Sequence, residues 1–161
     1  WITDREADGG GPVVIFCWHK EVAATLHELL CNGDENRCLM VTGNTNAADK
    51  TEAVRRFQED ADVKYIVATN CLSEGVTLTK AATVVVLEYP WRPADVDQQC
   101  ARVHRIGQTD SVNAIFFHAP GTVDDAIVAL LDRKRQTADV AINDTHWIMD
   151  FLKAQKEGGK K

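Results

Sequence analysis

The stretch Val13-Val14-Ile15-Phe16-Cys17 is a continuous apolar run, and it decides the fold class. Five apolar residues in a row are typical of a strand that is covered on both faces, because side chains alternate between the two faces. A helix is predicted directly after it, over Lys20–Leu30, with Val22 and Leu26 on one apolar stripe and Asn32-Gly33 at its end. A covered strand followed at once by an amphipathic helix favours an α/β fold.

The same alternation of strand and helix continues along the chain. Further strands are predicted over Cys38–Val41, Tyr65–Ala68, Thr83–Leu87 and Val112–His118, and further helices over Ala47–Gln58, Pro93–Arg105 and Val123–Lys134. The pattern predicts right-handed crossovers and a mainly parallel central sheet with helices on both faces. Ligands in such sheets gather at the carboxyl ends of the strands, so the informative loops are expected after Phe16, Val41, Ala68 and Leu87.

Length and composition fit one domain with a core of its own. The chain has 161 residues, of which 45% are hydrophobic and 26% charged. Gly9-Gly10-Gly11-Pro12 predicts a linker or tail over residues 1–12, followed by the domain over 13–138. Residues 139–161 are predicted to form a C-terminal helical extension and tail, with an apolar turn around Trp147 and Phe151. No apolar stretch approaches the roughly 18–20 residues of a membrane span, and the N-terminus lacks the apolar centre of a signal peptide, so no membrane partner is expected.

Charge and cysteine content restrict the partners and the compartment. The net charge of −6 is not that of a typical nucleic-acid binder, so any DNA contact must come from a local surface or from another domain. The five cysteines are odd in number and contain no CxxC pair, which favours free thiols in a reducing, intracellular compartment. A metal site is not expected.

The segment Gln98–Gln108, QQCARVHRIGQ, carries the strongest chemical signal. Arg102 and Arg105 are three residues apart, which places them on one face of a helix. If the predicted helix ends at Arg105 before Gly107, both guanidinium groups extend past the edge of the domain. A planar, permanently charged group of this kind suits the charge that develops on a transferring γ-phosphoryl group, where it contributes roughly 10³–10⁵ in rate. The alternative for two arginines alone is a surface salt bridge.

The pattern QxxxRxHRxGQ resembles motif VI of the Swi/Snf-type superfamily-two ATPases. The resemblance implies a RecA-like lobe that uses ATP with Mg²⁺, in which Arg102 and Arg105 are catalytic. Val67–Leu78 is similar to motif V, although Leu72-Ser73 stands where many members have two glycines. In that family frame Gly75, Glu74 and Gln98 belong to the nucleotide-binding set together with the two arginines.

Several loops resemble the parts of the family that hold nucleic acid. Thr42, Gly43 and Thr45 are similar to an Asp-Gly-Ser-Thr segment of the family, and Thr69 lies in motif V. Trp91 and Arg92 stand where members have Trp-Asn-Pro, and His19 and Lys20 stand at the motif IV position. Short polar residues and glycine at the end of a strand present N–H groups to phosphate, and an exposed tryptophan stacks on nucleic acid. A helix cap at Thr45, a simple helix start at Lys20 and a core position for Trp91 are the alternatives.

Two elements that ATP hydrolysis requires are missing from the sequence. No GxxxxGK[ST] phosphate loop and no Asp-Glu metal-binding motif occurs, so this fragment alone is predicted to be inactive. The resemblance therefore implies the second motor lobe of an ATP-dependent translocase on double-stranded or branched DNA, with a first lobe of the same polypeptide holding Mg²⁺. Residues 105–113 and 121–125 look nearest to the fork-remodelling, annealing-helicase branch. The location is expected to be the nucleus in a eukaryote and the cytoplasm or nucleoid in a bacterium.

Two other classes of function stay open on the sequence. One is a degenerate helicase lobe that serves as a non-catalytic docking scaffold, against which the arginine pair argues. The other is a self-sufficient enzyme of the doubly wound class, such as a sugar transferase, which requires a general base of its own. The five histidines show no pairing of that kind.

Overall fold

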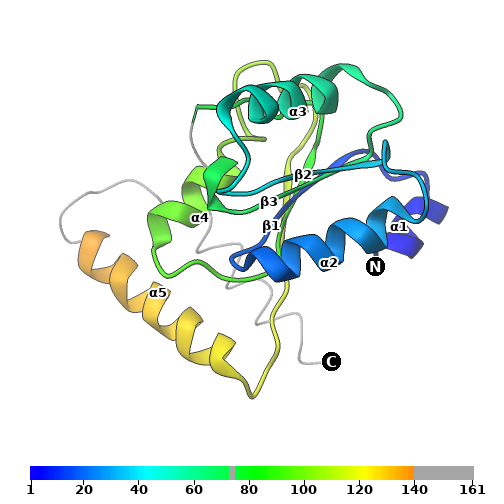
Figure 1. Cartoon of the computed structure of the whole chain (residues 1–161). Coiled ribbons are helices and arrows are strands. Elements are labelled where there is room, and N and C mark those ends of the chain that lie inside the picture. The colour runs from blue at the N-terminus through cyan, green and yellow to red at the C-terminus, as the bar shows by residue number, and fades with distance from the viewer. Residues whose placement is uncertain (73–74, 140–161) are drawn as a thin grey trace.

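A five-stranded parallel sheet forms the centre of the computed structural model, which describes residues 1–72 and 75–139. The strands run in the spatial order β2-β3-β1-β4-β5, and every neighbouring pair is parallel (Figure 1). Their bounds are β1 Val13–Phe16, β2 Cys38–Val41, β3 Tyr65–Ala68, β4 Thr83–Val86 and β5 Asn113–Phe116. The predicted parallel sheet is confirmed.

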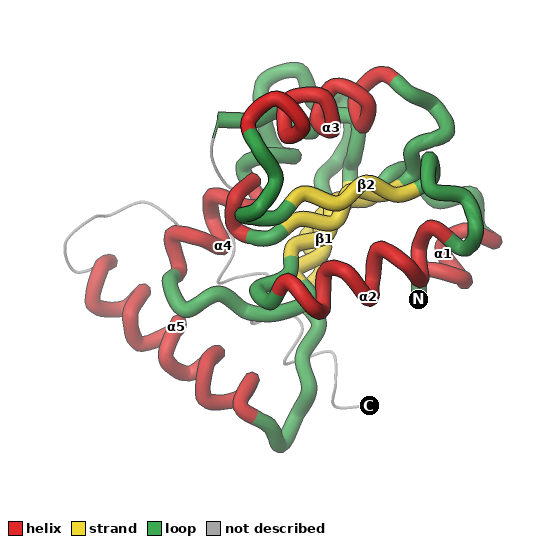
Figure 2. The backbone as a smooth tube through the Cα atoms, in the orientation of Figure 1, coloured by secondary structure: helices red, strands yellow, loops and turns green. Residues whose placement is uncertain are grey.

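Helices cover both faces of this sheet, as the alternation predicted (Figure 2). The helices are α1 Ile2–Ala7, α2 Lys20–Cys31, α3 Ala47–Glu59, the short 3₁₀ helix η1 Asn70–Leu72, α4 Pro93–Cys100 and α5 Val123–Asp139. Apolar residues of α1 and α2 pack on one face, and those of α3, α4 and α5 pack on the other. Within the described ranges, no helix is both long and apolar enough to cross a lipid bilayer.

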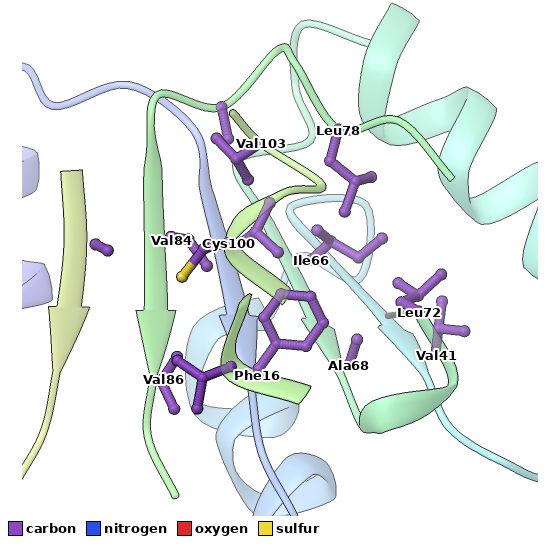
Figure 3. Packing of buried hydrophobic residues seen from close by; sticks show 14 of the residues in the cluster. Phe16, Val41, Ile66, Ala68, Leu72, Leu78, Val84, Val86, Cys100 and Val103 are labelled. Carbon is purple, nitrogen blue, oxygen red and sulfur yellow. The ribbon is translucent and has the colours of Figure 1, made fainter. Parts of the chain in front are cut away.

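The two faces of β1 belong to two separate apolar clusters. Val14 and Phe16 pack with Phe57 of α3, whereas Ile15 packs with Ala23 of α2. Figure 3 shows the first cluster, with the Phe16 ring between Val86 and Ala68 of the neighbouring strands. Because consecutive side chains point to opposite faces and both faces are dry, every position of β1 must be apolar. This is the physical reason for the uninterrupted run at the start of the domain.

The N-terminal residues differ from the predicted linker, because residues 2–7 form α1. Ile2 packs against the cluster under α2. The Glu6 carboxylate pairs with the Arg37 guanidinium and accepts a hydrogen bond from the Tyr65 hydroxyl. These partners lie 31 and 59 residues away along the chain, so no local pattern indicated them. The division into a domain over 13–138 and an extension over 139–161 stays a prediction, and Trp147 and Phe151 lie outside the described residues.

Helix α4 is shorter than predicted, because it ends at Cys100 and not at Arg105. The chain then tightens: the Arg102 and Val103 amides donate to carbonyls three residues back, at 3.2 Å each. The Arg102 carbonyl accepts from the amide of Leu78 at 2.9 Å, a partner outside the helix. Both arginines therefore lie on turns beyond α4, and their placement depends on the segment around Leu78.

Candidate functional site

Arg102 and Arg105 converge on a single main-chain carbonyl. The Nη1 atoms of Arg102 and Arg105 donate to the Val76 carbonyl oxygen at 3.3 Å and 3.1 Å. Arg102 also donates through Nε to the Gln98 carbonyl at 3.1 Å, and Arg105 donates to the Thr77 hydroxyl at 3.1 Å. One carbonyl therefore sets the separation of two positive charges.

The charge of Arg105 stays open to a further anion. Its side chain is exposed, and its hydrogen-bond partners among the described residues, Val76 and Thr77, are a carbonyl and a hydroxyl, both neutral. A guanidinium has five N–H donors in a planar arrangement that matches phosphate oxygens. Arg102 is only half-buried. The pair thus has the charge, the exposure and the donor geometry that a phosphate group requires.

The arginine pair does not lie at the carboxyl edge of the sheet, where the informative loops were expected. Helix α4 follows β4 in the chain, and its Val96 and Cys100 pack on the sheet. In Figure 3 Val103 and Leu78 lie near the amino-terminal ends of the strands, whereas Phe16 and Ala68 lie near the arrowheads. Because Arg102 adjoins Val103 and bonds to Leu78, it lies on the same side. The molecule therefore presents two separate candidate surfaces.

The remaining nucleotide-set residues are only partly brought together. Gly75, next to Val76, is exposed and has φ +71°, a left-handed conformation that favours glycine. The main-chain carbonyl oxygen of Gln98 accepts the hydrogen bond from Arg102 Nε. Glu74 lies outside the described residues. The structure thus places Gly75 and Gln98 beside the arginine pair.

At the carboxyl edge, the loops after β1 and β2 meet. Lys20 Nζ donates to the Asn44 side-chain oxygen at 2.7 Å, and Gly43 is exposed beside it. The Thr45 hydroxyl accepts from the Thr42 amide at 3.0 Å, while Thr42 itself is buried. Lys20, Gly43 and Thr45 therefore form one polar cluster, defined here as the edge cluster, with Lys20 as its cation.

The loop after β4 contributes an acid to this edge. Glu88 Oε2 accepts the amides of Trp18 and His19 at 2.9 Å and 3.0 Å, and Oε1 lies 2.7 Å from His19 Nδ1. The hydrogen bond to Glu88 and its negative charge raise the pKa of His19. Burial acts to raise the pKa of Glu88, but the hydrogen bonds from His19 and Trp18 outweigh it and lower that pKa. The imidazolium form of His19 is thereby favoured.

Trp91 and Arg92 lie on the surface, and the core alternative for Trp91 is wrong. The Trp91 side chain is 47% exposed and borders a cavity of about 600 Å³ against α5, whose Lys134 donates to the Trp91 carbonyl at 2.8 Å. The Arg92 guanidinium makes two hydrogen bonds of 3.0 and 2.8 Å to the carboxylate of Asp95, which is buried. Trp91 is therefore available to a ligand, while Arg92 also neutralises an acid of its own domain.

Thr69 faces inward. The residue is buried, and its hydroxyl lies 3.5 Å from the sulfur of Cys71, so the side chain does not reach the surface in this conformation. Two further residues at these surfaces, Glu88 and Lys50, are not indicated by the sequence pattern. Glu88 binds His19, and Lys50 donates to the carbonyl of Cys71. Gln108 lies inside the QQCARVHRIGQ segment, but its contacts with Thr79 and Ala81 are not visible in that pattern. No local pattern signals these partners, because each acts across 20 or more residues.

Comparison with known proteins shows which family the chain resembles. The family described as helicase conserved C-terminal domain matches residues 2–107. A mouse protein described as "DNA annealing helicase and endonuclease ZRANB3" is 30% identical over 131 residues, which is 81% of this chain. The chain spans 12% of the length of that relative.

Solved structures extend the comparison to the fold. The C-terminal part of the Fun30 ATPase domain superposes with a TM-score of 0.70 and 25% identity, covering 81% of this chain and 40% of that one. The Sulfolobus solfataricus SWI2/SNF2 ATPase core, solved in complex with double-stranded DNA, gives 0.68 and 26%, covering 88% and 30%. The parallel sheet with its two helical layers is therefore the RecA-like fold of these ATPase cores.

Proposed function

The chain belongs to the helicase C-terminal domain family, in its Swi/Snf branch, and we propose that it is the second motor lobe of an ATP-dependent translocase on double-stranded or branched DNA. The observation that carries the proposal is the convergence of Arg102 and Arg105 on the carbonyl of Val76. A degenerate scaffold has no use for two guanidinium groups held side by side at a surface.

The two arginines act as charge stabilisers for a phosphate group held elsewhere. ATP, bound with Mg²⁺ by a first lobe of the same polypeptide, supplies the energy when its γ-phosphate is hydrolysed. Arg105 binds Val76 and Thr77 through Nη1, and its other N–H donors neutralise charge on the phosphate oxygens. Arg102 adds a second positive charge from a more buried position. Because both arginines rest on one carbonyl, they approach the phosphate as a unit.

The edge cluster forms the DNA grip of this lobe, together with His19 and Trp91. Lys20 offers positive charge, His19 offers an exposed imidazole ring, Gly43 allows a close approach of the backbone, and Trp91 offers a half-exposed ring. These groups are local, which fits a chain with a net charge of −6. The DNA grip and the arginine pair lie on separate surfaces of this lobe. When the two lobes close on ATP, the DNA grip therefore moves with the lobe as a rigid unit.

The test is DNA-stimulated ATP hydrolysis by the full-length protein. Arg105→Ala and Arg102→Ala are each expected to lower kcat by about 10³-fold, the magnitude typical of an arginine finger. Arg55→Ala is the matched control, since that arginine is exposed on α3 and pairs only with acids of its own helix among the described residues, Glu52 and Glu59. Rates within about threefold of wild type for both finger variants would contradict the proposal.

The lobe by itself is proposed to hydrolyse no ATP. Its sequence contains no phosphate loop and no metal-binding acidic motif, so nothing holds the β- and γ-phosphates. Calorimetric titration of the 161-residue chain with Mg-ATP is expected to show only weak binding. The full-length protein is further proposed to act where its DNA lies, in the nucleus of a eukaryote or in the cytoplasm or nucleoid of a bacterium.

A further inference from the structure

The segment 76–81, which carries the carbonyl shared by the two arginines, belongs to no helix or strand. Its position therefore depends on side chains and isolated hydrogen bonds. Leu78 is fully buried, and its amide bonds to the Arg102 carbonyl at 2.9 Å. These contacts fix the middle of the segment. Further anchors are two glutamines and the side chain of Lys80, whose Nζ donates to the carbonyls of Asp60 and Val63.

Gln108 anchors the segment from the side of the arginines. Its Nε2 donates to the Thr79 carbonyl at 3.0 Å and to the Ala81 carbonyl at 2.7 Å. Its Oε1 accepts the amide of Asp110 at 2.9 Å. Both amide hydrogens and the carbonyl oxygen are thus in use, and only a carboxamide offers two donors and an acceptor on one planar group.

Gln108 is also tied directly to Arg105. The main-chain N–H of Gln108 donates to the main-chain carbonyl of Arg105 at 3.0 Å. Gly107 between them has φ +102°, which lets the chain turn back sharply. One residue therefore connects the turn that carries the guanidinium with the segment that carries its acceptor. The loop Val76–Ala81–Gln108–Arg105–Val76 is closed by hydrogen bonds.

We propose that Gln108 is a positioning residue for the arginine pair, holding segment 76–81 at the distance that lets Val76 accept from both guanidinium groups. The proposal rests on the proposed function of Arg102 and Arg105. Gln108 is partly buried and its carboxamide is occupied, so it acts through Arg105 and does not bind the phosphate itself. A displacement of about 1 Å at a reacting group is enough to lower a rate by up to roughly 100-fold.

The test uses Gln108→Glu in the full-length protein. This change keeps the shape of the side chain but sets a carboxylate oxygen against the carbonyls of Thr79 and Ala81, so both hydrogen bonds are lost. The expected result is a loss of about tenfold in the kcat of DNA-stimulated ATP hydrolysis, with the KM for ATP changed by less than about threefold.

Gln58→Glu is the matched control, because Gln58 holds the same segment from α3. Its Nε2 donates to the Thr79 hydroxyl at 3.3 Å, and its Oε1 accepts the amide of Lys80 at 2.9 Å. A hydroxyl can turn and donate to a carboxylate, whereas a carbonyl cannot. The same amide-to-acid change is therefore expected to leave kcat within about twofold of wild type. Equal losses in the two variants would mean general loosening of the segment and would overturn the proposal.

A double-mutant cycle separates positioning from a general structural role. In a background that carries both Arg102→Ala and Arg105→Ala, Gln108→Glu is expected to lower the residual kcat by less than about twofold, because the groups it positions are gone. A further tenfold loss there would show that Gln108 acts independently of the arginine pair and would overturn the proposal. If Arg102→Ala and Arg105→Ala each leave the rate within about threefold of wild type, it is the proposed function that fails. If Arg105→Ala abolishes activity while Gln108→Glu does not affect kcat, only the present inference fails.

Folding is checked by circular dichroism of each full-length variant. Should Gln108→Glu not fold, Gln108→Met replaces it in the cycle, since methionine keeps the length and volume without any amide donor. Failure of both variants to fold would overturn the proposal, because a residue that the fold requires is structural and not positioning.

Discussion

Glu88 accepts hydrogen bonds from both the backbone and the ring of His19, with His19 Nδ1 2.7 Å from Glu88 Oε1. His19 follows β1 and Glu88 follows β4, two strands that are adjacent in the sheet although 69 residues separate the partners. The contact fixes the start of α2, where Lys20 faces the loop after β2. The orientation of the proposed DNA grip therefore depends on an acid that does not itself attract DNA.

Replacing Glu88 is expected to lower the pKa of His19. The hydrogen bond and the negative charge of Glu88 raise that pKa in the folded protein, and Glu88→Gln removes the charge. The measurement is an NMR titration of the His19 ring in both proteins. Glu21→Gln is the control, because the charge of Glu21 is the weakest of the causes that raise the pKa. An unchanged His19 titration in Glu88→Gln would contradict the assignment.

The same pair is expected to make stability depend on pH in a defined window. The raised pKa of His19 contributes stability that is fully present below about pH 6.5, the unfolded value, and is lost as pH rises through the folded value. The lowered pKa of Glu88 contributes stability that is present above 4.5 and is lost as pH falls through its folded value. Denaturant unfolding should thus show the largest difference between wild type and Glu88→Gln between about pH 4.5 and 6.5.

Trp91→Ala is expected to weaken coupling to DNA while basal ATP hydrolysis by the full-length protein survives. Stacking of one base on an aromatic ring contributes about 1–3 kcal/mol, so the DNA concentration for half-maximal stimulation should rise roughly five- to hundredfold. Phe117→Ala is the control, because Phe117 is similarly exposed and packs edge-on against Trp1. Equal DNA dependence in wild type and Trp91→Ala would remove Trp91 from the proposed grip.

Arg92→Ala is expected to destabilise the fold by about 1–3 kcal/mol, because it leaves the buried carboxylate of Asp95 without its strongest partner. Arg55→Ala, which breaks exposed pairs with Glu52 and Glu59, is expected to cost less than about 1 kcal/mol. Urea unfolding of the two variants at pH 7 compares these losses directly. A smaller loss for Arg92→Ala than for Arg55→Ala would contradict the structural role of Arg92.

The cysteines are expected to differ in reactivity. Burial raises the pKa of Cys17, Cys38 and Cys100 to about 12, so almost no thiolate is present at neutral pH and reagents cannot reach the sulfur. Cys71 is only half-buried and should be alkylated first. Mass spectrometry after brief iodoacetamide treatment, with and without denaturant, gives the order. Labelling of Cys100 before unfolding would contradict its burial.

Several strands and helices of the domain could be predicted from local sequence. The structure confirms β2 and β3 with the predicted bounds, and α3 begins at Ala47 as expected. These elements are specified by periodicity over a few residues, since a strand dry on both faces must be apolar throughout and a covering helix must be apolar on one stripe. Alternation of the two then requires a parallel sheet.

Local sequence specifies the α/β architecture and the residue types of the candidate site, because spacing within a helix or strand is a local property. The end of α4 at Cys100 and the convergence of both arginines on Val76 depend on the packed fold. The same holds for Glu88 and Gln108. The distant contacts of Arg102, Glu88 and Gln108 span 26 to 70 residues of sequence. Such contacts exist only after the sheet has brought the loops together, so no pattern along the chain records them.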